Sequence, residues 1–205
     1  MSDHSVKLLD AVADTLSRST GEVQLPLHIL LENHFGDLNE NQEELLEAAS
    51  AAADRIDLAS RHLQRILDLE HGRITFQREA VRLGDLLQPV LAIAAARGEE
   101  REVKVAADRP PLSPFVAADR YFLGEALTAL FVAVIDRAES STELLVKVSG
   151  EKTRVRIDLN YSGGPLDGLE PVMATRLVQA QQGEVEMVAG RVTVTLMASA
   201  LVRRS

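Results

Sequence analysis

The sequence contains no cysteine and few aromatic residues, and these two shortages restrict its chemistry and its core. Without cysteine the chain forms no disulfide, offers no thiol nucleophile and supplies no thiolate ligand to a metal ion. Aromatic residues make up 3% of the chain, whereas 46% of its residues are hydrophobic. We therefore predict an aliphatic core built from leucine, valine, isoleucine and alanine.

An excess of basic residues and a long hydrophobic run are also missing. The net charge is −9, and a chain of this charge would repel phosphates, so we expect no nucleic-acid partner. The longest apolar run, near Leu127–Ile135, is too short to span a bilayer, and the first residues lack the pattern of a signal peptide. We therefore expect a cytoplasmic protein without a membrane partner.

The clearest periodic signal lies between Asn39 and Gly72, where small and apolar residues recur at alternating steps of four and three. This spacing is typical of an a/d seam, which keeps one stripe of a helix facing a partner. Asn39 with Gln42 predicts a capping box at the helix start, and Gly72 predicts the helix end. Such a helix needs an antiparallel neighbour, a second copy of itself, or both. The predicted dimer seam comprises Leu45, Ala49, Ala52, Ile56, Ala59, Leu63 and Ile66.

A second helical pattern precedes this helix, over 2–18 and again over 27–38. Pro26 stands between the two parts and either starts a new helix or kinks a continuous one. Gly36 and the aspartate after it predict a short turn, and a short turn makes two helices antiparallel neighbours. We therefore expect a helical hairpin over 1–72, and two copies of it forming a four-helix bundle as a homodimer.

The remaining residues, 73–205, mix strand and helix patterns. Alternation with period two predicts strands, and helical spacing of apolar residues predicts helices. The order βαβαββαββ favours an α/β sandwich with a mixed sheet and helices on one face, so the fold class of the whole chain is α+β. The predicted strands are 73–80, 102–106, 144–149, 154–160, 185–188 and 192–197, and the predicted helices are 83–97, 121–137 and 171–182.

Three segments resemble the core of two-component sensor histidine kinases. Leu63–Leu69 is similar to the end of that family's second helix, Asp119–Leu123 to the lead-in of its N-box helix, and Leu177–Gly183 to its last helix and turn. In that family a dimerisation and phosphotransfer hairpin precedes an ATP-binding domain. The resemblance implies a phosphotransfer-like hairpin over 1–72 and an ATPase-like sandwich over 73–205.

Two motifs of that family have lost the residues that carry their chemistry. The H-box reads H-E-x-x-x-P; Glu22 and Pro26 match it, but Gly21 stands where the phosphoaccepting histidine should be. The N-box needs two asparagines, four residues apart, to hold magnesium and phosphates. Ala129 and Ala133 stand in their places.

The two glycine-rich boxes are also altered. Tyr161 replaces the aspartate of D-x-G-x-G that reads adenine, although Gly163 is kept. The lid box G-x-G-L-G is reduced to Gly168 and the leucine after it, and Glu170 adds a negative charge where phosphates would lie. The resemblance therefore implies a degenerate, pseudokinase-like protein with no bound cofactor and no metal. Its length and its lost ATP motifs are similar to those of histidine phosphotransferases with a kinase-like fold.

His28 is the residue that could still carry phosphate, because it lies seven residues after Gly21, about two helical turns along the same face. The alternative for His28 is a solvated or packing histidine. His34 is in register with apolar residues of the first helix, which predicts a position in the bundle core or seam. In the resembling family the receiver domain docks on this face. The predicted docking face comprises Gly21, Glu22, Leu27, His28, Leu31 and Glu32.

Three functions follow from the resemblance. The first is a non-catalytic, dimeric scaffold or inhibitor that docks a response-regulator receiver domain or a partner kinase. The second is a histidine phosphotransferase that relays phosphate through His28. Phosphotransferases of this shape keep the H-box histidine, so its loss favours the first function. The third, an active histidine kinase, requires every motif alignment above to be wrong.

Overall fold

The computed structural model describes residues 3–32, 36–108 and 114–199 of the 205-residue chain. The chain divides into two compact units, Met1–Arg73 and Ile74–Ser205, and each is described by itself. The first unit is helical and the second combines helices with β-sheet, so the predicted α+β fold class is confirmed. In the part of the chain that the structure describes, no helix is long and apolar enough to cross a membrane.

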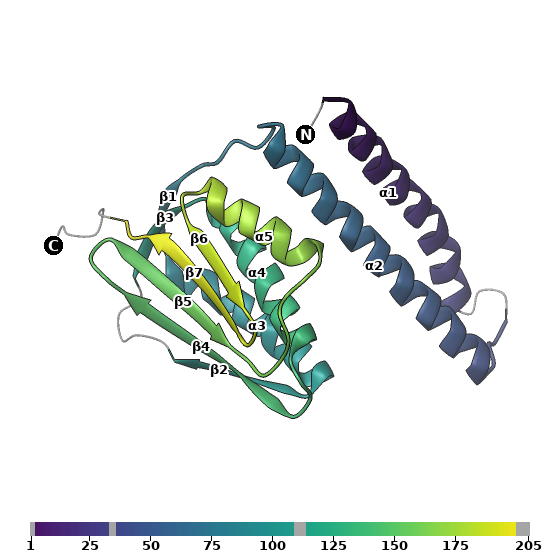
Figure 1. Cartoon of the computed structure of the whole chain (residues 1–205). Helices are drawn as coiled ribbons and strands as arrows, with labels where there is room; N and C mark the ends of the chain where they lie inside the picture. Colours follow the sequence, from purple (N-terminus) through teal and green to yellow (C-terminus); the bar gives the residue numbers. More distant parts are fainter. Residues whose placement is uncertain (1–2, 33–35, 109–113, 200–205) are drawn as a thin grey trace. The chain divides into compact units, whose positions relative to one another are not determined.

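The first unit is an antiparallel pair of helices, α1 (Asp3–Leu31) and α2 (Glu40–Glu70), which lie side by side in Figure 1. The helix α1 runs without interruption through Pro26, so the proline neither starts nor ends a helix. The predicted capping box is confirmed, because the side chain of each of Asn39 and Gln42 accepts a hydrogen bond from the backbone N–H of the other. His34 lies outside the described residues.

The contact between α1 and α2 uses small and polar side chains. The Ser60 hydroxyl donates to the Ala13 carbonyl at 2.8 Å and lies 3.1 Å from the Ser17 hydroxyl. Near the other end of the contact, Gln24 Nε2 donates to Asp54 Oδ1 at 2.8 Å. Small residues at the contact let the two backbones approach closely. On α2 this interface stripe comprises Leu46, Ser50, Ala53, Asp57, Ser60, Gln64 and Leu67, all buried or half-buried.

The predicted dimer seam is a different stripe of α2, displaced by one residue, or about 100° around the helix. Its residues do not form the centre of the hairpin interface. Leu45 remains 71% exposed and Ile56 47% exposed, Ala49 is exposed, and the remaining four positions are half-buried. Within the first unit, α1 therefore covers the interface stripe of α2 but does not cover the predicted dimer seam.

The second unit is a sandwich whose main sheet has the strand order β2-β4-β5-β7-β6. The pair β2–β4 is parallel and the other pairs are antiparallel, so the sheet is mixed. Figure 1 shows helices α3, α4 and α5 on one face of this sheet. The elements are β1 (Glu79–Arg82), α3 (Leu83–Arg101), β2 (Val103–Asp108), β3 (Phe115–Ala118), α4 (Arg120–Arg137), β4 (Thr142–Gly150), β5 (Arg154–Asn160), α5 (Leu169–Ala180), β6 (Glu184–Val188) and β7 (Arg191–Met197).

Two sequence predictions for this unit are wrong in detail. The strand expected over 73–80 begins only at Glu79 and ends at Arg82. This strand, β1, pairs with β3 in a separate two-stranded sheet. The strand β3 was not predicted, because four residues after a proline-rich segment are too few to show alternation. The helix α3 continues four residues past its predicted end, to Arg101, and is followed by the C-cap residue Glu102 with its positive φ of 55°.

Helix α4 lies at the centre of the aliphatic core. Leu123, Leu127 and Ile135 on this helix are completely buried. They face the side of the sheet on which alternate residues of each strand are buried, such as Leu144 on β4 and Ile157 on β5. Each such aliphatic side chain stabilises the fold by roughly 1.5–3 kcal/mol. Ala129 and Ala133, the positions that the sequence analysis aligns with the N-box, lie on this helix.

Candidate functional site

Three of the predicted docking residues, Gly21, His28 and Glu32, lie on one exposed face of α1. Gly21, Leu25, His28 and Glu32 follow one another at steps of four, three and four, so they project from the same side of the helix. His28 Nε2 lies 3.0 Å from Glu32 Oε1, and the His28 side chain is 68% exposed. Leu25 is 64% exposed. An ideal Cβ at Gly21 would meet no atom within 4 Å, so the space over it is open.

The structure separates the other predicted docking residues from this face. Leu27 and Leu31 are half-buried and share the helical phase of the buried Ala13 and Thr20, which places them on the hairpin-facing side of α1. Glu22 is exposed but lies about 100° around the helix from Gly21. Sequence periodicity alone missed Leu25, because an exposed leucine is recognised only when the hairpin-facing side of α1 is known.

Acidic residues of α2 lie on the same side of the hairpin as this face of α1. The hydrogen bond from Gln24 brings Asp54 beside this face, and Glu43, Glu47 and Leu58 share the helical phase of Asp54. Leu58 is 39% exposed. We call this surface the acidic face. It comprises Gly21, Leu25, His28 and Glu32 of α1 with Glu43, Glu47, Asp54 and Leu58 of α2.

The opposite side of the hairpin is apolar. Exposed aliphatic residues on α1 recur at helical spacing, about 100° from the hairpin-facing side and away from the acidic face. In an antiparallel pair this places them on the same side as the predicted dimer seam of α2. We call this surface the apolar face. Its α1 residues are Leu8, Val12, Leu16, Val23 and Leu30, and its α2 residues are the predicted dimer seam.

In the second unit, both N-box positions lie on α4. Ala129 is buried, and half-buried Ala133 lines a small hollow of about 140 Å³ together with Asp136, Leu166 and Glu170. This volume is below the range of roughly 300–1,000 Å³ that is typical of small-molecule sites. Among the described residues, no group of three or more histidine and acidic side chains is placed to hold a metal ion.

An ion pair bridges this hollow. Arg137 Nη2 lies 2.6 Å from Asp167 Oδ1, and Arg137 Nε donates to the carbonyl of Pro165 at 2.9 Å. The guanidinium therefore links the end of α4 to the segment before α5. That segment ends at Gly168, whose φ of 108° favours glycine, and Gly168 caps α5.

Tyr161 is built into the core beside the same segment. It is 6% exposed, and its hydroxyl donates to the carbonyl of Gly164 at 2.7 Å. Its backbone N–H donates to the carbonyl of Gly190 at 3.0 Å. Burial raises the pKa of the Tyr161 phenol above its ordinary value. The phenol is therefore a neutral structural donor at physiological pH, and its hydrogen bond points into the protein.

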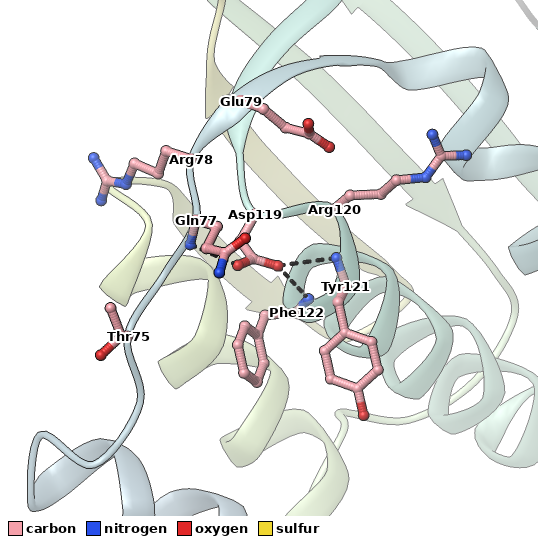
Figure 2. A pocket seen from close by; sticks show the side chains of 8 residues that line it. All are labelled: Thr75, Gln77, Arg78, Glu79, Asp119, Arg120, Tyr121 and Phe122. Atoms are coloured by element: carbon pink, nitrogen blue, oxygen red, sulfur yellow. Dashed lines mark hydrogen bonds between the residues drawn. The ribbon is translucent and has the colours of Figure 1, made fainter.

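A larger hollow of about 590 Å³ lies at the start of α4 (Figure 2). The buried carboxylate of Asp119 accepts hydrogen bonds from the backbone N–H groups of Gln77, Tyr121 and Phe122 at 2.8, 3.0 and 3.2 Å. The N–H of Asp119 donates to Gln181 Oε1 at 2.7 Å. Asp119 thus joins the segment before β1, the start of α4 and the end of α5, which gives this residue a structural role.

Comparison with solved structures identifies the arrangement. The histidine kinase AdeS of Acinetobacter baumannii superposes with a TM-score of 0.64 and 13% sequence identity, over 90% of this chain and 96% of that one. The chain has the fold of a histidine kinase core. Full-length ShkA in complex with AMPPNP gives a TM-score of 0.61 at 20% identity, and the match spans 91% of this chain but only 46% of ShkA.

Two further solved structures match about three fifths of the chain. The catalytic domain of histidine kinase ThkA gives a TM-score of 0.51 at 15% identity, over 61% of this chain and 97% of that domain. The mycobacterial sensor histidine kinase MprB gives the same TM-score at 12% identity, over 60% of this chain and 98% of that one. No protein-family model and no curated protein matches the sequence. At these identities the comparisons establish the fold.

The retained Gly163 has a packing role that can be tested. A Cβ at this position would lie 2.5 Å from the carbonyl oxygen of Arg137, whereas the nearest atom to a Cβ at Gly164 is 4.0 Å away. We expect Gly163→Ala to lower the free energy of unfolding by about 1–3 kcal/mol through overpacking. The matched Gly164→Ala change should stay within about 0.5 kcal/mol. Urea denaturation measures both, and equal effects would contradict this account.

Proposed function

We propose that the protein is a dimeric, non-catalytic module of two-component signalling that docks a response-regulator receiver domain and acts as a scaffold or inhibitor. The observation that carries the proposal is the pair of unpartnered faces on opposite sides of one hairpin. The apolar face accepts a second copy of the chain, and the acidic face stays accessible in that dimer. The histidine kinase fold, together with the altered motifs, supports docking without phosphorylation.

The apolar face needs a partner because its exposed aliphatic side chains run the length of the hairpin. Covering one exposed leucine, isoleucine or valine removes apolar area worth roughly 1.5–3 kcal/mol at full burial. The alanines between them on α2 permit a close approach of a second backbone. A second copy offers the same stripe, so the contact is self-complementary. The result is a four-helix bundle in which each acidic face points outward.

We expect Ile56→Asp to convert the dimer to monomer, because it places a charge in the centre of the apolar face. Leu58→Asp is the matched control: Leu58 has similar exposure but lies on the acidic face, so this variant should remain dimeric. Sedimentation equilibrium at micromolar concentration measures both, with circular dichroism to verify folding. A monomeric wild-type chain would remove the basis for a dimeric module.

The altered motifs support the absence of ATP chemistry. Alanine side chains at positions 129 and 133 offer no oxygen to magnesium, which binds oxygen ligands. The phenol of Tyr161 donates a hydrogen bond to the carbonyl of Gly164, and it is not the carboxylate that the D-x-G-x-G box uses to read adenine. The ion pair of Arg137 with Asp167 lines the hollow next to Ala133.

We expect no heat of binding when the protein is titrated calorimetrically with Mg-ATP at millimolar concentration, because metal, base and phosphates each lack their ligand. A folded ATP-binding histidine kinase domain serves as the positive control. A dissociation constant below about 100 μM, equivalent to more than about 5 kcal/mol of binding free energy, would show a functional nucleotide site and contradict the non-catalytic proposal.

Phosphotransfer through His28 remains the second candidate, favoured by the exposure of this side chain and its contact with Glu32. The Glu32 carboxylate can orient the imidazole ring of His28 through this contact. An exposed histidine in this setting is chemically able to accept a phosphoryl group from a receiver aspartate. Transfer would break the aspartyl O–P bond and form an N–P bond on the imidazole, with loss of its proton.

Incubation with phosphorylated receiver domains separates the two candidates. We expect no acid-labile label on the protein, and we expect His28→Ala to change receiver affinity by less than about fivefold, because a single rim residue seldom carries more than 1 kcal/mol. Glu32→Lys should weaken association. Label on the wild type that disappears in His28→Ala would establish the phosphotransferase instead. Label that persists in His28→Ala but disappears in His34→Ala would assign it to the other histidine.

A further inference from the structure

The net charge of the chain is concentrated at one end of the hairpin. Residues 21–57 contain nine acidic residues and one basic residue, a net charge of −8 out of −9 for the whole protein. The remaining 168 residues are therefore almost neutral, with 22 acidic and 21 basic residues. At physiological ionic strength charges act over about 8 Å, so a partner approaching this end meets a locally strong negative field.

The fold accounts for only some of these charges, such as Asp57, which forms an ion pair with Arg61 at 2.8 Å. Acidic residues in the first turn of a helix are stabilised by its dipole, which explains Glu40 and Glu43 of α2. Glu47 and Asp54 lie beyond the first turn, and the dipole effect falls off within that turn. Glu43 and Glu47 form no ion pair with any residue that the structure describes. In the proposed bundle two such ends lie together, and their mutual repulsion opposes dimerisation.

The acidic residues surround an apolar centre. Among the side chains of α1 that the structure describes, from residue 8 onward, Leu25 is the most exposed large hydrophobic residue. It stands one helical turn from Gly21, where the absence of a side chain leaves room for an incoming group. Leu58 on α2 adds a second exposed apolar side chain. Protein interfaces commonly place a few desolvated apolar anchors at the centre and charged residues at the rim.

From this arrangement, and resting on the proposed function, we infer that the partner of the acidic face is a receiver domain with a basic docking surface. Lysine or arginine side chains of the receiver surround an apolar socket, and the socket receives Leu25. The rim charges steer association and select basic receivers over acidic ones, while Leu25 determines how long the complex lasts. The partner class is therefore defined by its charge as well as by its fold.

The test measures association and dissociation rates of the full-length protein with purified receiver domains whose docking surfaces range from acidic to basic. The charge variant is Glu43→Gln with Glu47→Gln, and its matched control is Glu184→Gln with Glu186→Gln on β6, which removes equal charge elsewhere. The anchor variant is Leu25→Ala, and its control is Leu145→Ala, which truncates an exposed leucine of β4. All substituted side chains are exposed, so folding should be preserved, and circular dichroism verifies it.

We expect basic receivers to bind and acidic ones to bind at least about tenfold more weakly, because like charges at an interface are unfavourable. The Glu43/Glu47 variant should slow association about three- to tenfold and flatten its dependence on salt. Leu25→Ala should speed dissociation about tenfold and leave the salt dependence unchanged. Both control variants should behave as the wild type.

Other outcomes overturn the inference in distinguishable ways. Receivers that bind irrespective of their charge, with rates insensitive to salt and to the Glu43/Glu47 change, would refute the basic partner and leave the proposed docking function standing. Polylysine that binds as tightly as the receivers, with Leu25→Ala without effect, would show a general attraction of polycations and refute the specific face. Absence of binding to every receiver would refute both the inference and the proposed function.

Discussion

The close contact between α1 and α2 is the constraint on which the rest of the hairpin depends. Ser60 donates to the backbone of Ala13 and meets the hydroxyl of Ser17, so small polar groups let the two helices approach closely at this point. Leucines such as Leu46 and Leu67 also lie in the contact, but other aliphatic side chains of the two helices, such as Leu16 and Ile56, stay exposed. The helical phase set by Ser60 also decides which residues of α1 face outward, and so defines both the apolar face and the acidic face.

In the second unit, the positions that the sequence analysis aligns with kinase motifs make contacts inside the protein. Ala129 is buried within the core helix α4, Arg137 bridges to Asp167 across a hollow of about 140 Å³, and Tyr161 turns its hydroxyl inward to Gly164. Each of these contacts stabilises the sandwich without a bound nucleotide, because interiors are close-packed and polar groups find partners inside. Asp119 adds a junction between three segments of this unit. The fold of a kinase domain can therefore persist where the kinase motifs have changed.

Much of the fold was predictable because it depends on local or strongly periodic signals. The capping box of Asn39 and Gln42, the long helix α2 and the β4–β5 hairpin all follow from short-range patterns. The strand β3 was not predictable, since its four residues pair with residues of β1 that lie 33 to 39 positions earlier in the sequence. For the candidate site, the sequence suggested His28 but grouped it with Leu27 and Leu31. Those two leucines and the exposed Leu25 differ only in helical phase, and phase is fixed by contacts between Ser60 and α1, which no local pattern reveals.

The two faces of the hairpin impose opposite demands on one short segment. In the proposed dimer, contact through the apolar face would bring two ends of net charge −8 together, and their repulsion would lower the stability of the bundle. A sequence selected for bundle stability alone would balance these charges with lysine or arginine, because ion pairs at helical spacing are easily formed on exposed helix surfaces. Arg55 is the only lysine or arginine among residues 21–57. Asp57 is paired with Arg61 just outside this range, and the charge that remains unbalanced is what the proposed basic receiver domain would complement when it docks on the acidic face.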